Sequence, residues 1–174
     1  MSSNWQKSGP NYVPAYQASG IPYVTSSVAS EVPGVDGNSA SSEPIAVHFP
    51  YVTKFVTIRN TGINALRVGF SIRGLFKPAE RQPTSLGGAA KSDVSATDHS
   101  NFFLIPTASI AGSLQSFDIR CKSIYFMSDG TDNSPGAAHA TSFSLLAGLT
   151  TIPSEQFPVL TGSVAGTGSF EGVG

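Results

Sequence analysis

Residues 51–75, Tyr51-Val-Thr-Lys-Phe-Val-Thr-Ile-Arg-Asn-Thr-Gly-Ile-Asn-Ala-Leu-Arg-Val-Gly-Phe-Ser-Ile-Arg-Gly-Leu75, decide the fold class of this chain. The first nine are mostly β-branched or aromatic, which favours a strand. From Ala65 to Leu75, apolar residues alternate with arginine, glycine and serine, as in a half-buried strand. The apolar positions are Leu66, Val68, Phe70 and Ile72, and the positions predicted to lie on the other face are Arg67, Gly69, Ser71 and Arg73. Between the two segments, Asn60–Asn64 supplies Asn and Gly for a tight turn, so the stretch predicts two strands joined by a short connection.

Six further segments carry strand patterns, and none carries a helical one. No window of a dozen residues has apolar residues at helical spacing without an interrupting Pro or Gly. The predicted strands are Ile21–Val28, Ile45–Phe49, Phe102–Ile105, Leu114–Arg120, Ile124–Met127 and Phe143–Leu149. Eight short strands with long connections indicate an all-β sandwich or barrel, and a single jelly roll of two four-stranded antiparallel sheets fits best. An immunoglobulin-like sandwich is the alternative, but the chain is long for it and lacks its cysteine pair.

The length of 174 residues predicts one domain. Residues 1–20 are polar with three aromatics and predict an extended N-terminal arm, which leaves residues 21–174 as the jelly-roll domain. Within that domain, residues 76–101 form a long loop of low periodicity, a kind of connection that is usually functional or mobile. Residues 161–174 form a Gly-rich tail.

Composition excludes several classes of function. Only 12% of residues are charged, the net charge is −1 and 40% of residues are hydrophobic, so neither disorder nor direct nucleic-acid binding is expected. The single cysteine, Cys121, excludes a disulfide scaffold and is predicted to be a small buried apolar residue. The polar start predicts no secretory signal, and we expect synthesis in a cytoplasm.

Catalytic motifs are missing. His48, His99 and His139 have no cysteine or second histidine at metal-ligand spacing, and no Gly-x-Ser-x-Gly elbow occurs. We therefore predict no enzyme and assign no catalytic, cofactor-binding or metal-binding residue. The turn Asp129-Gly-Thr-Asp132-Asn133 offers oxygen ligands that suit Ca²⁺. Its sequence is also common in ordinary turns, so cation binding there is left open.

Charges are sorted along the chain. Residues 44–91 contain seven Lys or Arg and only one acidic residue, Glu80, whereas residues 123–174 contain four Asp or Glu and no Lys or Arg. One reading is that these are solvated faces. The sharper hypothesis is a self-complementary assembly, in which the basic side of one subunit meets the acidic side of the next and the contacts close into a ring.

Several segments together resemble single jelly-roll penton proteins, which occupy the five-fold vertices of large icosahedral double-stranded DNA viruses. The resemblance spans about residues 20–174. It rests on strand patterns in order and spacing: His48-Phe-Pro-Tyr-Val-Thr-Lys-Phe-Val-Thr-Ile-Arg-Asn-Thr-Gly62, Leu66-Arg-Val-Gly-Phe-Ser71, Asn101-Phe-Phe-Leu104, Cys121-Lys-Ser-Ile-Tyr-Phe126, Ser142-Phe-Ser-Leu-Leu-Ala-Gly-Leu-Thr-Thr-Ile-Pro153 and Phe157-Pro-Val-Leu-Thr-Gly-Ser163.

The resemblance implies a structural capsid protein. Five copies would form a homopentamer beside the major capsid protein and minor capsid proteins, within a virion assembled in the host cytoplasm. No enzymatic activity, cofactor or small-molecule substrate is implied, and contact with an inner membrane is not specified. The alternatives are a minor capsid or cement protein off the five-fold axis, and a lectin-like or cytokine-like trimer. Aromatic residues outside the predicted strands are the candidates for subunit contacts, since they have no obvious core to fill: Trp5, Tyr12, Tyr16 and Phe170.

Overall fold

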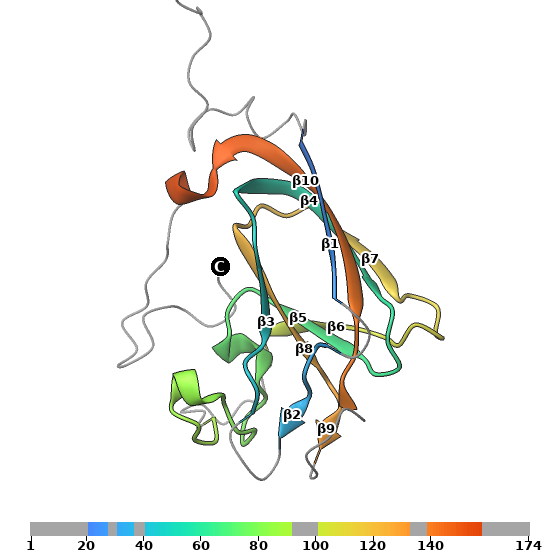
Figure 1. The fold of residues 1–174 in the computed structure, drawn as a ribbon, viewed down its shortest axis with the longest axis vertical. Helices are drawn as coiled ribbons and strands as arrows, with labels where there is room; N and C mark the ends of the chain where they lie inside the picture. The colour runs from blue at the N-terminus through green and yellow to red at the C-terminus, as the bar shows by residue number, and fades with distance from the viewer. Residues whose placement is uncertain (1–20, 28–30, 37–40, 92–100, 133–138, 158–174) are drawn as a thin grey trace, which may run out of the picture.

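In the computed structural model, two four-stranded antiparallel sheets stack face to face (Figure 1). The structure describes residues 21–27, 31–36, 41–91, 101–132 and 139–157. Sheet 1 contains, in spatial order, β1 (Ile21–Ser26), β10 (Phe143–Pro153), β4 (Tyr51–Asn60) and β7 (Leu114–Phe117). Sheet 2 contains β3 (Ile45–His48), β8 (Ser123–Ser128), β5 (Leu66–Gly69) and β6 (Phe102–Ile105). The all-β prediction is therefore confirmed, and no α-helix occurs among the described residues.

The strand order is consistent with a jelly roll. If the eight long strands are numbered along the chain, the first pairs with the eighth, the second with the seventh, the third with the sixth and the fourth with the fifth. These are the pairs of one long folded-back hairpin. Rolling that hairpin up adds two contacts, β10 with β4 and β8 with β5, and both are present. The result is the two-sheet architecture of a jelly roll.

The main core lies between the sheets and follows from period-two alternation. Along β10, Phe143, Leu145, Ala147 and Leu149 are all buried, as predicted. The aromatic ring of Phe143 stacks on that of Phe126 from β8, with ring centroids 4.0 Å apart. Side chains from the two opposing sheets thus meet in one core.

The connection at residues 60–64 does not form a hairpin, because β4 belongs to sheet 1 and β5 to sheet 2. Asn60 holds this crossover: its amide donates to the carbonyl oxygens of Asn64 and Pro106, at 2.7 and 3.0 Å. Gly62 is required by packing, since a Cβ atom there would lie 2.2 Å from the hydroxyl oxygen of Thr141. A short turn therefore carries the chain across the sandwich.

The strand predicted from Ala65 to Leu75 is shorter than expected. β5 ends at Gly69, and the chain then turns into the 3-10 helix η1 (Arg73–Leu75). All four residues of β5 are buried, including Arg67, which the alternation had placed on the polar face. The prediction was wrong because a second layer of chain covers the outer face of sheet 2 at this strand.

The remaining predicted strands are confirmed with small changes at their ends. β1 stops at Ser26 and β7 at Phe117, and β4 continues to Asn60. The sequence analysis missed a two-residue parallel pair, β2 (Val35–Asp36) with β9 (Thr131–Asp132), and two further 3-10 turns, η2 (Thr84–Leu86) and η4 (Ser154–Gln156). Elements this short carry no recognisable periodicity.

Candidate subunit-interaction surface

The outer face of sheet 2 is covered by the chain itself. Residues 70–91 fold back over this face and form a second, smaller core against β8. Its buried members are Val35, Leu75, Phe76 and Met127. Gly69 permits the close approach, because a Cβ atom there would lie 3.0 Å from the Leu75 side chain. Phe76, at the start of the predicted loop, therefore belongs to this second core.

Arg67 ties this covering segment to the sheet. Its side chain is fully buried, and its guanidinium binds both carboxylate oxygens of Glu80, at 2.6 and 2.8 Å. It also donates to Asp129 at 2.6 Å and to the carbonyl oxygen of Leu75 at 2.8 Å. The ring of Phe102 lies 4.8 Å from the guanidinium carbon, a cation–π distance.

The electrostatics of this cluster favour the charged forms of Arg67 and Asp129. Burial lowers the pKa of Arg67, but hydrogen bonds and charges from Glu80 and Asp129 outweigh it and raise that pKa above its ordinary value. Burial raises the pKa of Asp129, but Lys77 and Arg67 outweigh it and hold that pKa below its ordinary value. The fork of two hydrogen bonds from an arginine to one carboxylate is the geometry that best compensates a buried charge.

The cluster also changes the interpretation of the sorted charges. Arg67 and Lys77 come from the basic segment and Asp129 from the acidic one, and they pair within one chain. Lys91 is buried as well, with its ammonium 3.0 Å from the carbonyl oxygen of Phe76. At least three of the seven basic residues are thus engaged within the chain itself. Asp129 has two cationic partners, so in this structure its carboxylate neutralises side chains of the protein itself.

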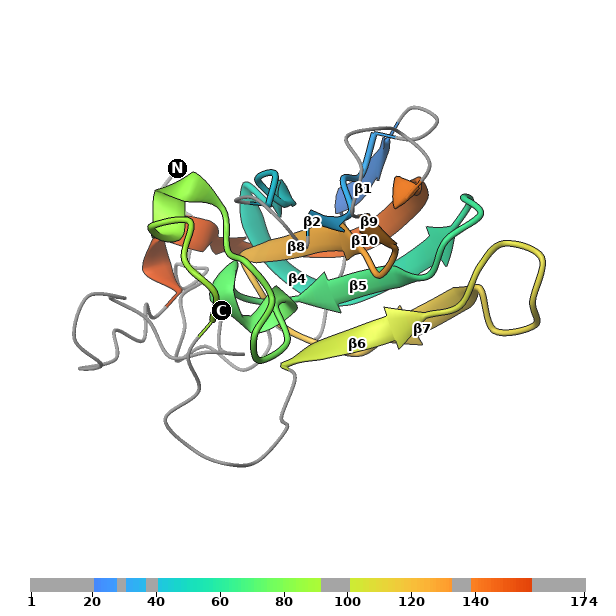
Figure 2. The same cartoon turned by 90° about the horizontal axis from the view of Figure 1, so that it is seen from below.

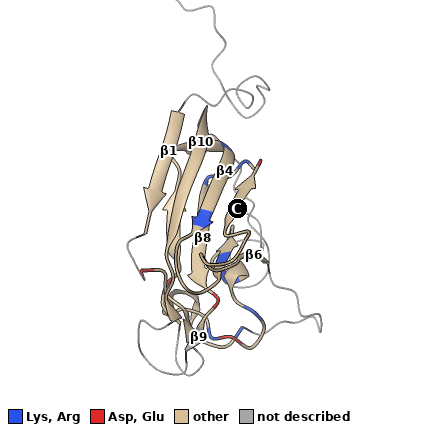
Figure 3. Ribbon diagram, turned by 90° about the vertical axis from the view of Figure 1, so that its right-hand side faces the viewer, with Lys and Arg blue, Asp and Glu red and all other residues tan. Residues whose placement is uncertain are grey.

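Sheet 1 differs from sheet 2, because the described residues leave most of its outer face open (Figure 3). Strands β1 and β10 contain no Lys, Arg, Asp or Glu. The outward positions of these paired strands include Val24 and Leu146, directly opposite each other and both exposed. Near η4, the side chain of Phe157 packs on Val52 and Ile152. Elsewhere the described part of the chain leaves this face uncovered.

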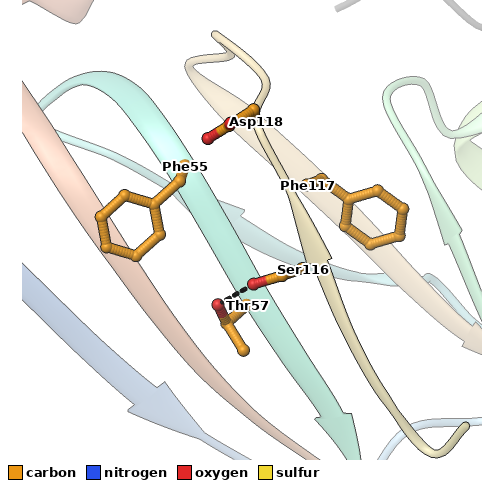
Figure 4. Close-up of a pocket in the computed structure, with 5 residues that line it drawn as sticks. All are labelled: Phe55, Thr57, Ser116, Phe117 and Asp118. Carbon is orange, nitrogen blue, oxygen red and sulfur yellow. Dashed lines mark hydrogen bonds between the residues drawn. The ribbon is translucent and has the colours of Figure 1, made fainter. Parts of the chain in front are cut away.

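A shallow depression lies on the same sheet between β4 and the end of β7 (Figure 4). It is lined by Phe55, Thr57, Ser116, Phe117 and Asp118. The hydroxyl groups of Thr57 and Ser116 point toward one another and share a hydrogen bond across the strand pair. Two aromatic residues, two hydroxyls and an exposed carboxylate therefore border one open hollow.

The four edge strands share an unusual composition. β1 and β7 are the edges of sheet 1, β3 and β6 are the edges of sheet 2, and none of the four contains Lys, Arg, Asp or Glu. Soluble proteins commonly protect exposed edges with charges, especially lysine, or with proline, because unpaired strands recruit other chains. Pro22 in β1 is the one such residue in these four strands. These edges are therefore suited to contact with other protein.

The structure describes only some of the residues that the sequence singled out. Trp5, Tyr12, Tyr16, Phe170 and His99 lie outside the described residues. His48 is exposed on β3, with its ring edge-on to Tyr125, and His139 is half-buried in the chain before β10. No pair of these histidines is brought together in the described structure.

Cys121 is buried, as predicted. Burial raises the pKa of its thiol to about 11, although a hydrogen bond with Thr53 acts in the opposite direction. The described residues contain no group of three or more His, Cys, Asp or Glu placed to hold a metal ion. No helix in the described part is long and apolar enough to cross a membrane.

Alternation along the sequence does not reveal Arg67 as the centre of a buried cluster. The signal that could have found it is Glu80, the single acidic residue among seven basic ones between positions 44 and 91. The uncharged edges were also missed, because edge strands can be recognised only when the sheet order is known.

No protein-family model, curated protein or solved structure matches this chain significantly. The resemblance to penton proteins accordingly stays a prediction.

Proposed function

We propose that this chain is a structural capsid protein, and that five copies form the penton at each five-fold vertex of an icosahedral virion. The observation that carries the proposal is the set of four edge strands without a charged residue, joined to an open outer face on sheet 1. A subunit surrounded by other protein needs few surface charges, because charged residues are depleted from interface cores. The fold itself hosts many functions, and viral capsid domains are prominent among them.

The proposed partners follow from the same role. The homopentamer would contact the major capsid protein and minor capsid proteins in the virion, and it would carry no enzymatic activity and no cofactor. A minor capsid or cement protein off the five-fold axis would share these surfaces but not the pentameric ring.

Native mass spectrometry of the purified chain tests the proposal. A pentamer supports it, whereas a trimer, or a monomer at both low and high salt, contradicts it. Labelling the protein in intact particles then distinguishes a vertex position from a facet position.

The N-terminal arm gives a second test. Trp5→Ala is expected to lower particle yield while the circular dichroism spectrum and melting temperature of the isolated protein stay unchanged. Unchanged particle yield would contradict a contact role for Trp5. Thr84→Asp, at an exposed position of the covering segment, is the matched control and should leave yield as it is.

The depression on sheet 1 favours a second candidate function, carbohydrate binding by a lectin-like module. The ring of Phe55 could stack on a sugar, while Asp118 accepts hydrogen bonds from its hydroxyls. A glycan array followed by titration of Asp118→Ala tests this alternative. Saturable binding that the substitution abolishes supports it, and absence of binding to any glycan rules it out.

A further inference from the structure

The contact surfaces of the proposed oligomer can be assigned from the two sides of the sandwich. On one side, β6 and β7 are the edge strands of different sheets and lie next to each other (Figure 2). The rings of Phe103 and Phe117 meet there with centroids 5.3 Å apart. The turn at residues 60–64 joins this side, because the Ala108 amide donates to the carbonyl oxygen of Gly62 at 3.0 Å.

The two edge strands on this β6–β7 side, and the connection between them, are apolar and carry no charged residue, while exposed Arg59 and Asp118 lie at its border. Residues 101–117 contain no Lys, Arg, Asp or Glu. Five of the eight large hydrophobic residues that the described structure exposes lie here: Ile63 (78% exposed), Phe103 (53%), Leu104 (51%), Ile110 (56%) and Leu114 (59%). The largest exposed apolar patch of a protein is often a functional contact surface.

The exposed area is large enough for a stable contact. Half of a large apolar side chain is about 100 Å², so these five side chains offer about 500 Å² of apolar surface. A standard interface buries about 800 Å² per partner, and in homodimers about 65% of it is apolar, which is again about 500 Å². The β6–β7 side therefore exposes an apolar area of the size that one interface buries, spread over the edge of the sandwich and the adjoining outer faces of the two sheets.

The other side of the sandwich offers a second, different apolar surface. Strands β1 and β3 are the opposite edges of the two sheets, and they too lack charged residues. The remaining three exposed large hydrophobic residues lie on β1 and its neighbour β10: Ile21, Val24 and Leu146. A partner of another kind needs one such surface, whereas a ring of identical subunits needs two different ones on each copy.

We propose that a second copy of this chain is the occupant, and that the β6–β7 side of one subunit packs head-to-tail against the β1–β10 corner of the next. The inference rests on the proposed function, because only a heterologous contact of this kind closes a five-fold ring. Beyond the proposed function, it assigns the two surfaces that meet. Because the two surfaces differ, neither makes the ring by pairing with itself.

Two variants test the assignment, each with exposed side chains altered so that folding is retained. Val24→Asp alters the β1–β10 corner, and the double variant Ile110→Asp/Leu114→Asp alters the β6–β7 side. Each alone is expected to shift the native mass spectrum from oligomer to monomer. When the two are mixed, with one ¹⁵N-labelled, one intact surface of each kind remains, so a 1:1 heterodimer is expected and no larger ring. Thr84→Asp should assemble like the wild type.

The outcomes separate the inference from the proposed function. If the wild type is a pentamer and Val24→Asp still assembles, the head-to-tail assignment is wrong and the penton proposal stands. If the wild type forms another ring, such as a trimer, and the mixture gives the heterodimer, the assignment stands and the penton proposal fails. A wild type that is monomeric at every salt concentration overturns both, and it indicates that a different protein covers these surfaces.

Discussion

The two outer faces of this sandwich differ in what covers them. Over sheet 2, the chain supplies its own cover, residues 70–91, fastened by Arg67 to Glu80 and Asp129. Over most of sheet 1, the described chain supplies none, and Val24 and Leu146 stay exposed. The difference teaches that the covered face contributes to the stability of the chain, whereas the described residues leave the other face available for contacts with other molecules. Substitutions on the two faces should therefore separate into folding effects and assembly effects.

Removing the buried arginine should give the largest effect on folding. Arg67→Ala leaves Glu80 and Asp129 without their main partner and opens space at β5, so a loss of about 4 kcal/mol in the free energy of unfolding is expected. Urea denaturation followed by fluorescence measures it. Arg59→Ala, at an exposed position of β4 on the open face, is the matched control and should change stability by no more than about 0.5 kcal/mol. Equal losses for both variants would remove the distinction between the faces.

Truncating a leucine on each face should give the next largest difference. Leu75 is fully buried under the covering segment, and Leu75→Ala is expected to cost about 3 kcal/mol through lost burial and a cavity. Leu146 is 43% exposed, and Leu146→Ala should cost less than about 1 kcal/mol. The same denaturation assay compares the two, and a cost at Leu146 as large as that at Leu75 would show that the open face is part of the folded core.

Acid should weaken the covered face through Asp129. Because its pKa is lower in the folded than in the unfolded chain, its contribution is fully present above the unfolded value of about 3.9 and is lost as the pH falls through the folded value. The stability of the wild type should therefore fall more steeply below about pH 4 than that of Asp129→Asn. Glu80 is present in both proteins, so the difference isolates Asp129. Parallel pH profiles would contradict the assignment.

The smallest effect is expected at the hydroxyl pair on the open face. Thr57 and Ser116 form an exposed cross-strand hydrogen bond, a kind of pair that contributes about 0.5 kcal/mol. Thr57→Ala should therefore leave the denaturation midpoint nearly unchanged. A loss above about 2 kcal/mol would show that the bond is shielded from water and that the face is covered in solution.

The contrast between the faces also marks what sequence reasoning can reach. Strands such as β10 were predicted because alternation is a local signal that survives in any arrangement of sheets. The burial of Arg67 was missed because the same signal assigns every charged residue to solvent. Burial becomes tolerable only through partners that lie elsewhere in the chain, chiefly Glu80 and Asp129. The crossover at Gly62 was missed because turn residues specify a local bend and not which sheet each strand joins. The lack of charge in these segments can be read from the sequence. Which segments are edge strands can be decided only when the strand order is known.

The position of β10 has a consequence for how the protein is made. This strand lies between β1 and β4, so sheet 1 stays in separate pieces until residues 143–153 have left the ribosome. The partners of β10 are well over a hundred and about ninety residues earlier in the chain, and such distant pairing is slow to form. Val24 gains its neighbour Leu146 only at that moment. A nascent chain thus has no finished β1–β10 corner, so any contact that uses this corner must wait until residues 143–153 have been made.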